Sequence, residues 1–182
     1  MALGTTAEME QFLADVEKRA FRIARFAVGN HDDALEIVQE AMIKLVERYS
    51  ASPHEEWPPL FYRILQSRIR DHQRRQKVRD RVHTWFGFGR EDTDENPIDS
   101  LPARADADPA RRNAGNETLD AVEEAIGNLP LRQQQAFLLR AWEGLDVAQT
   151  AQAMGCSEGS VKTHYSRALQ ALREVLKEHR HE

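Results

Sequence analysis

The stretch DVAQTAQAMGCSEGSVKTHYSRAL, residues 146–169, decides the fold of this 182-residue chain. Asp146 is a suitable N-cap for a short helix over 147–154, a range rich in small residues. Gly155 follows, and glycine adopts the positive φ of a tight turn at little cost. Ser157 can then cap a second helix. The stretch therefore predicts two capped helices joined by a tight turn.

The second helix of this pair carries polar side chains near its start, opposite an apolar stripe that begins at Val161. A recognition helix has this arrangement, because its first turns meet base edges and phosphates in the major groove. The pattern favours a helix-turn-helix over an ordinary helical hairpin. The residues that we expect to face duplex DNA are Ser157, Ser160, Lys162, Thr163, His164, Ser166 and Arg167.

Helical periodicity also runs through the rest of the chain. Apolar residues recur at steps of three and four, which predicts helices over 8–28, 32–49, 60–81, 118–129 and 131–142. Gly29 can end the first helix, and Asn30 or Asp32 can cap the second. The expected buried stripe of the second helix is Leu35, Val38, Met42, Leu45 and Tyr49. Strand patterns are almost absent, so we expect an all-α fold.

The composition changes between residues 87 and 116. This range is rich in proline, glycine and acidic residues, which is typical of a linker. We therefore expect two small helical domains, 1–86 and 117–182, joined by a flexible acidic linker over 87–116. The second domain contains the helix-turn-helix.

The net charge of −5 hides an uneven distribution along the chain. Residues 1–62 carry a net charge of −5, residues 63–90 carry +7, residues 91–128 carry −8 and residues 129–182 carry +1. Local clusters of charge set the field that a phosphate backbone meets. One strongly basic segment therefore lies between two acidic ones, which is compatible with a DNA-binding protein.

The helix expected over 32–49 has an acidic, polar outer face. This face consists of Asp32, Asp33, Glu36, Gln39, Glu40 and Lys44. Periodicity alone favours a plain solvated surface for these residues, and a binding surface is the alternative.

The next helix is strongly basic, and aromatic residues stand close to its start. Arginine side chains bind phosphates and aromatic rings stack on unpaired bases, so this combination suits single-stranded nucleic acid. Core packing is the other reading of the rings, which we expect for Phe61 and leave open for Trp57. The candidate DNA-binding residues are Trp57, Arg63, Arg68, Arg70, Arg74, Arg75, Lys77 and Arg79.

Four segments together resemble the sigma-70 family of RNA polymerase sigma factors. DDALEIVQEAM (32–42) looks like the polymerase-binding helix of that family, and WPPLFYRILQSRIRDHQRR (57–75) resembles the segment that melts and reads the −10 promoter element. LPLRQQQAF (129–137) resembles the start of the fourth sigma region, and GSVKTHYSRA (159–168) its −35-reading helix. Without the extra domains of housekeeping sigma factors, the chain is identified as a member of the small extracytoplasmic-function class.

The resemblance implies a sigma factor that binds core RNA polymerase and directs promoter recognition, DNA melting and transcription initiation. It implies that the acidic face binds the β′ clamp, that the basic helix holds DNA near the melted region, and that Trp57 captures an unstacked base. The β flap of polymerase, promoter DNA and an anti-sigma factor are the other implied partners. The acidic linker either mimics RNA in a polymerase channel or is plainly solvated. Residues 133–135 and 147–151 depart from the family pattern, which leaves the promoter sequence open.

A helix-turn-helix regulator that acts on duplex DNA without being a polymerase subunit is the alternative function. Only the acidic outer face of the helix expected over 32–49 argues against this alternative. We expect no enzyme, cofactor or metal site, because the histidines have no metal-ligand spacing with Cys156 and no nucleophile motif or phosphate-binding glycine loop is present. The single cysteine excludes an internal disulfide. Without a signal peptide or an apolar run of about 20 residues, we expect no membrane insertion and a cytoplasmic location.

Overall fold

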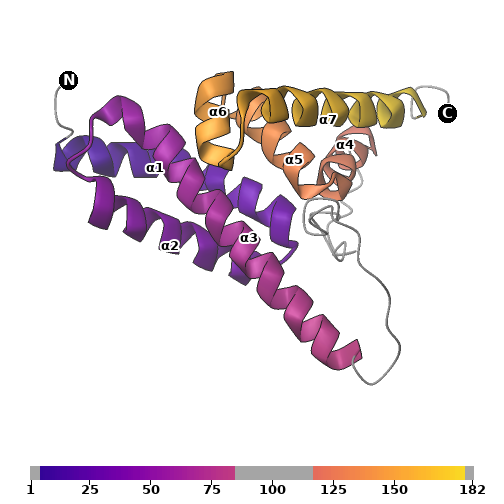
Figure 1. Ribbon diagram of the computed structural model, residues 1–182, viewed down its shortest axis with the longest axis horizontal. Helices are drawn as coiled ribbons and strands as arrows, with labels where there is room; N and C mark the ends of the chain where they lie inside the picture. Colours follow the sequence, from indigo (N-terminus) through magenta and orange to yellow (C-terminus); the bar gives the residue numbers. More distant parts are fainter. Residues whose placement is uncertain (1–4, 85–116, 179–182) are drawn as a thin grey trace.

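The computed structural model describes residues 5–84 and 117–178, with side chains for 5–79 and 120–177. All regular elements within these two ranges are helical (Figure 1), which confirms the all-α fold class. The expected linker, 87–116, lies outside the described residues. The domain limits at 86 and 117 therefore stay a prediction, and the two described ranges are called the N-terminal and C-terminal halves below.

Three long helices form the N-terminal half. They are α1 (Thr6–Val28), α2 (His31–Tyr49) and α3 (Trp57–Thr84), with a short 3-10 turn, η1 (His54–Glu56), directly before α3. Each of the three long helices contacts the other two. Figure 1 shows that the second half of α3 extends beyond the other helices.

The ends of α1 and α2 are set by local hydrogen bonds. The Thr5 hydroxyl accepts from the backbone N–H of Glu8 at 3.2 Å, and the Glu8 carboxylate accepts from the backbone N–H of Thr5 at 2.6 Å. These bonds lower the pKa of Glu8 below its ordinary value. Gly29 ends α1 with a φ of 73°, and the Asn30 side chain accepts from two backbone N–H groups at the start of α2. The predicted stop at Gly29 and cap at Asn30 are confirmed.

The buried side of α2 differs from the expected stripe. Its buried residues are Ala34, Ile37, Val38, Ala41 and Leu45. Leu35, expected inside, is 39% exposed, while Met42 and Tyr49 are half-buried. The helix carries more apolar residues than one stripe can hold, and the two alanines turn inward because a small side chain lets neighbouring helices approach closely. The prediction for Leu35 is therefore wrong.

The C-terminal half is built from shorter helices. They are α4 (Glu117–Asn128), α5 (Leu131–Phe137), η3 (Leu138–Trp142), α6 (Val147–Met154) and α7 (Glu158–Glu178). Helix α7 contacts α4, α5 and α6, so it links the other helices of this half.

The helix expected over 131–142 changes its hydrogen-bond pattern after Phe137. The segment η3 is a π-helical turn, in which the backbone N–H of Glu143 donates to the carbonyl of Leu138 at 3.0 Å. Such wider turns are rare and leave residues beyond them in a shifted orientation. Ala141, within this turn, is exposed.

The helix-turn-helix has the predicted caps. The Asp146 carboxylate accepts from the backbone N–H of Gln149 at 2.7 Å, and the Gln149 side chain accepts from the backbone N–H of Asp146 at 3.0 Å. Gly155 ends α6 with a φ of 64°, as the turn requires. Ala148 is exposed, and Thr150 is buried on the inner face of α6.

Replacing Asp146 with alanine is expected to lower the free energy of unfolding by about 1 kcal/mol, because the carboxylate that accepts from the backbone N–H of Gln149 is lost. Urea unfolding followed by circular dichroism measures this change. Asp120→Ala is the control, since Asp120 is an exposed acid inside α4. An equal loss in both variants would contradict a capping role for Asp146.

The two halves pack against each other. Helix α6 lies against α3, and α1 contacts α4. Figure 1 shows α6 (orange) beside the first half of α3 (magenta), with α7 running along the outer side of the C-terminal half. The buried apolar residues of both halves form one continuous cluster. The described helices therefore share a single core across the α3–α6 contact.

Candidate nucleic-acid interface

The basic part of α3 places most of its arginines at the surface. The exposed members of the predicted set are Arg63, Arg74, Arg75 and Arg79, and the half-buried members are Arg68, Arg70 and Lys77. Three of the exposed arginines, Arg74, Arg75 and Arg79, belong to the second half of α3. Exposed guanidinium groups on such a helix can reach the phosphates of a nucleic acid that lies alongside.

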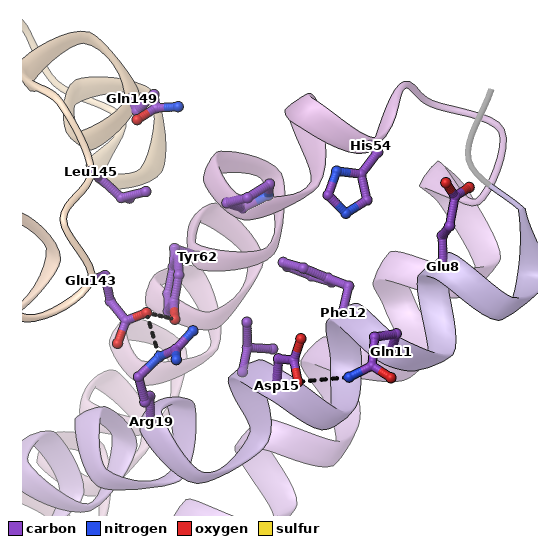
Figure 2. Close-up of a pocket in the computed structure, with 12 residues that line it drawn as sticks. Glu8, Gln11, Phe12, Asp15, Arg19, His54, Tyr62, Glu143, Leu145 and Gln149 are labelled. Carbon is purple, nitrogen blue, oxygen red and sulfur yellow. Dashed lines mark hydrogen bonds and ion pairs between the residues drawn. The ribbon is translucent and has the colours of Figure 1, made fainter. Parts of the chain in front are cut away.

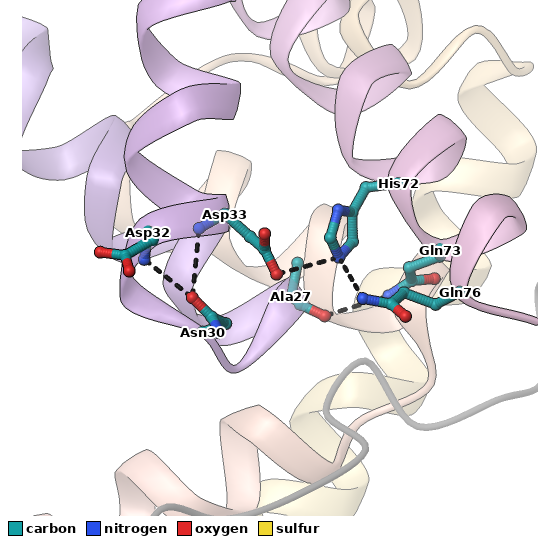
Figure 3. Close-up of polar contacts among 7 residues, drawn as sticks. All are labelled: Ala27, Asn30, Asp32, Asp33, His72, Gln73 and Gln76. Atoms are coloured by element: carbon teal, nitrogen blue, oxygen red, sulfur yellow. Dashed lines mark hydrogen bonds and ion pairs between the residues drawn. The ribbon is translucent and has the colours of Figure 1, made fainter. Parts of the chain in front are cut away.

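Among the described side chains, Arg68–Glu40 and His72–Asp33 contacts join α3 to α2. Arg68 Nε lies 3.3 Å from a carboxylate oxygen of Glu40, and His72 Nε2 lies 3.6 Å from a carboxylate oxygen of Asp33. Figure 3 shows Asp33 and His72 facing each other across the two helices, with Asn30 capping α2 beside them. Arg68, expected to hold DNA, and Glu40, expected to hold polymerase, therefore contact each other, so the two predicted surfaces share an edge.

The outward side of α2 combines acidic and apolar side chains. Asp32, Glu36 and Gln39 are exposed, and Lys44 is half-buried. Beside them Ile43 is 57% exposed and Val46 is 41% exposed, and together with Leu35 they form the apolar outer stripe of α2. Sequence reasoning missed Ile43 and Val46. The excess of apolar residues over one buried stripe was the signal that could have found them.

Trp57 does not belong to the DNA-facing surface. Its side chain is fully buried, and its ring packs on Phe12 and His54 with ring centroids 5.9 and 5.0 Å apart. Its indole N–H donates to the carbonyl of Tyr49 at 3.1 Å. A base cannot stack on an enclosed ring, so the prediction that Trp57 captures an unstacked base is wrong for this structure. Trp57 is a core residue, and so is Phe61, as expected.

The first turns of α7 divide into capping residues and outward residues. The backbone N–H of Ser160 donates to the Ser157 hydroxyl at 3.1 Å, and the Thr163 hydroxyl donates to the carbonyl of Gly159 at 3.0 Å. Lys162, Ser166 and Arg167 are exposed, and His164 is half-buried. The exposed cations Lys162 and Arg167 therefore face outward from a capped helix end, as base and phosphate contacts require.

The described ranges contain neither a candidate membrane-spanning helix nor a candidate metal site. No helix in residues 5–84 or 117–178 is long and apolar enough to cross a membrane. The same residues hold no group of three or more histidine, cysteine, aspartate or glutamate side chains that could bind a metal ion.

Two family models match the chain, one on each half. The model of sigma-70 region 2 matches residues 10–79, and the model of sigma-70 region 4 matches residues 119–172. The first match contains α2 and most of α3, and the second contains the helix-turn-helix. Both matches lie within the predicted domain limits.

Curated relatives match over nearly the whole length. An RNA polymerase sigma-E factor of Streptomyces avermitilis is 28% identical over 177 residues, which cover 97% of this chain and 89% of the relative. The sigma factor SigV of Bacillus subtilis is 28% identical over 177 residues, with 93% and 91% covered. The sigma factor RpoE of Bartonella quintana, solved in complex with the anti-sigma factor NepR, has a similar fold. Its TM-score is 0.60 at 23% identity, over 92% of this chain and 98% of that one.

Proposed function

The chain belongs to the sigma-70 family, as an extracytoplasmic-function sigma factor that directs transcription initiation, and from this premise we propose how its surfaces divide that work. The outer face of α2 binds the β′ clamp of core RNA polymerase. The exposed arginines of α3 hold promoter DNA near the −10 element. The start of α7 reads the −35 element as duplex, while the C-terminal half rests on the β flap.

The observation that carries this proposal is the outer face of α2. Leu35, Ile43 and Val46 are 39%, 57% and 41% exposed on one helix, next to exposed acidic residues. Full burial of one such aliphatic side chain is worth about 1.5–3 kcal/mol, so a partner that covers this face gains several kcal/mol. A regulator that only binds duplex DNA has no use for this surface, which favours the sigma factor over that alternative.

The exposed acidic residues on this face indicate the charge of the partner surface that it would bind. The exposed residues Asp32, Glu36 and Gln39 lie on the same side of α2 as its apolar outer stripe, and the two carboxylates suit a basic partner surface. Asp33 and Glu40 are paired with His72 and Arg68 of α3, so they orient α3 rather than contact polymerase alone.

We extend the proposal to an anti-sigma partner. The related RpoE is bound to an anti-sigma factor, and inhibition is most direct when an inhibitor covers the surface that polymerase needs. The exposed α2 face is the surface that such an inhibitor would compete for.

The test of the proposed function is reconstitution. Purified chain is mixed with core RNA polymerase, and the transcripts made from genomic DNA are sequenced. We expect a stable complex and transcripts that start downstream of one shared promoter motif. A core polymerase that neither binds the chain nor changes its start sites would overturn the proposal.

Changing Arg74 and Arg75 together to alanine is expected to weaken holoenzyme binding to a promoter and to make that binding less sensitive to salt. Each lost phosphate contact lowers the slope of log K against log[salt] by about one unit, so the double change lowers it by about two. Binding to labelled promoter DNA at several salt concentrations measures the slope. Lys18→Ala is the control, because Lys18 is an exposed cation on α1. An unchanged slope in the double variant would contradict the assignment.

A further inference from the structure

The loop that leads into the helix-turn-helix is held from two sides. Gly144, with a φ of 68°, turns the chain between η3 and α6. Figure 2 shows Glu143, just before this turn, pointing toward Tyr62 of α3 and Arg19 of α1. The Tyr62 hydroxyl donates to the Glu143 carboxylate, and Arg19 Nε donates to the same oxygen at 3.1 Å. The first hold on the loop therefore comes from the N-terminal half.

The second hold comes from within the C-terminal half. Leu145 follows the turn, and its backbone N–H donates to the carbonyl of Leu139 at 3.0 Å. Its own carbonyl accepts from Arg140 Nη1. Leu139 and Arg140 both belong to the π-helical turn η3, and such turns are frequent at functional sites. Because Leu145 precedes Asp146, the N-cap of α6, Arg140 holds the backbone at the entrance to the helix-turn-helix.

The same arginine also contacts α7. Arg140 Cζ lies over the ring of Tyr165, 5.7 Å from the ring centroid. Phe137, three residues before Arg140, stacks on this ring with centroids 6.4 Å apart and an angle of 20° between the planes. The cation is attracted to the aromatic face, and the stacked rings add an attraction that depends on their geometry. One side chain of α7 is therefore held by two residues from outside that helix.

Tyr165 is the large side chain that resists rotation of α7 about its axis. It is half-buried, four residues after Val161 on the buried side and three residues after the exposed Lys162. The next buried residue along this side, Ala168, is small. Valine and alanine offer few atoms that a rotation of the helix would separate, whereas the Tyr165 ring would lose contact with both of its partners. The ring therefore fixes the rotation of the first turns of α7.

A small rotation is enough to affect base reading. A helix with its side chains has a radius of about 5–6 Å, so a rotation of about 20° moves a side-chain tip by about 2 Å. Hydrogen bonds to base edges are lost over such a shift, because donor and acceptor bond only at about 2.7–3.2 Å. Binding to phosphates depends mainly on charge and tolerates the shift better. The ring therefore bears on which base sequence α7 prefers more than on how tightly it binds DNA.

We propose that Tyr165 is a positioning residue for reading the −35 element, and that Arg140 and Phe137 act through it. The ring sets the angle at which the exposed residues Lys162 and Ser166 meet the groove. The inference rests on the proposed function, because it concerns how the start of α7 reads that element. Tyr165 and Arg140 lie outside the set of residues that the sequence predicts to contact duplex DNA.

The first test replaces Tyr165 with leucine, which keeps an apolar side chain and removes the stacked ring. Holoenzyme made with the full-length chain is bound to a duplex carrying the −35 element that the reconstitution identifies, and to the same duplex with that element scrambled. We expect the ratio of the two affinities to fall about tenfold, the size of one lost base contact, while binding to the scrambled duplex stays within about twofold. Tyr165→Phe keeps the ring and should keep the ratio.

Two comparisons separate positioning from other roles of the ring. If Tyr165→Phe loses as much preference as Tyr165→Leu, the hydroxyl contacts DNA directly and the inference is overturned. Leu172→Ala is the control for a merely structural role, because Leu172 is buried farther along α7. It should lower the melting temperature and keep the ratio. An equal fall of the ratio in Leu172→Ala would show that lost stability alone explains the effect of Tyr165→Leu.

The second test uses Arg140→Met, which removes the charge and the donor and keeps an unbranched apolar side chain. Loss of a cation–π contact is worth a factor of about two to five, so the ratio should fall by that factor. In a Tyr165→Leu background the same change should have no further effect, because Arg140 acts through the ring. Glu143→Ala removes the other hold on the loop and should keep the ratio.

Three results of the second test would overturn the inference. The first is an unchanged ratio in Arg140→Met, which also decides the matter if Tyr165→Leu does not fold. The second is a further fall of the ratio in the double variant, because Arg140 would then act on DNA without the ring. The third is an equal fall in Glu143→Ala, because any loosening of the loop would then suffice.

Core polymerase binding separates this inference from the proposed function. None of the changed residues lies on the outer face of α2, so all variants should bind core polymerase. A holoenzyme that prefers the intact −35 element, with Tyr165→Leu and Arg140→Met variants that keep this preference, refutes only the inference. A chain that never binds core polymerase refutes the proposed function, and the inference falls with it.

Discussion

Replacing Ile43 with glutamate is expected to lower the affinity of the chain for core RNA polymerase by about a hundredfold, with little change in folding stability. Ile43 is 57% exposed at the middle of the outer face of α2, so it contributes little to the core. A central apolar anchor of an interface is worth about 2–4 kcal/mol, and 1.4 kcal/mol corresponds to a factor of ten. The new carboxylate would also be buried without a partner in the complex.

Titration of labelled chain with core polymerase, in the absence of DNA, measures this effect. Val78→Glu is the matched control, because Val78 is 62% exposed on α3 and outside the proposed polymerase surface. Glu40→Arg is a weaker test, since it also places a second cation beside Arg68. Equal affinities of the Ile43 and Val78 variants would show that α2 does not bind polymerase through its apolar outer stripe.

Changing Lys162 and Arg167 together to alanine is expected to weaken holoenzyme binding to duplex carrying the −35 element by about a hundredfold. Both side chains are exposed at the start of α7, where a recognition helix meets the groove. One good base contact is worth about 1–3 kcal/mol, so two lost contacts reach this size. The hydroxyls of Ser157 and Thr163 bond within the turn, so we expect smaller effects of their removal on DNA binding.

Arg173→Ala is the control for this double change, because Arg173 is an exposed cation farther along the same helix. Binding is compared on a promoter duplex and on the same duplex with a scrambled −35 element. The double variant should lose the preference for the intact element, and the control should keep it. A preference that survives in the double variant would exclude these two residues from promoter reading.

The predicted caps and turns were the most reliable part of the sequence reasoning. Asn30, Asp146 and Gly155 act as expected, because a cap depends on a side chain and backbone groups only a few residues away. The predictions for Leu35 and Trp57 were wrong because their burial depends on contacts with other helices rather than on neighbouring residues. Which apolar side chain is buried depends on how closely a neighbouring helix approaches, and periodicity alone does not contain that distance.

The charged surfaces could be predicted in outline. Four arginines of α3 and two cations of α7 are exposed as expected, because a charged side chain is costly to remove from water; they are Arg63, Arg74, Arg75, Arg79, Lys162 and Arg167. The pairing of Arg68 with Glu40 was not foreseen, because it joins two helices whose relative rotation is set by packing.

The sequence by itself determined the helices, their caps, the helix-turn-helix at 146–169 and the family to which they belong, because each of these is encoded in neighbouring residues. Only the tertiary structure decided which side of α2 remains open to a partner and that Glu143 closes on Arg19 and Tyr62. It alone placed Arg140 over the Tyr165 ring of α7. These features join parts of the chain that local propensity leaves independent, and only the shared burial of apolar surface brings them together.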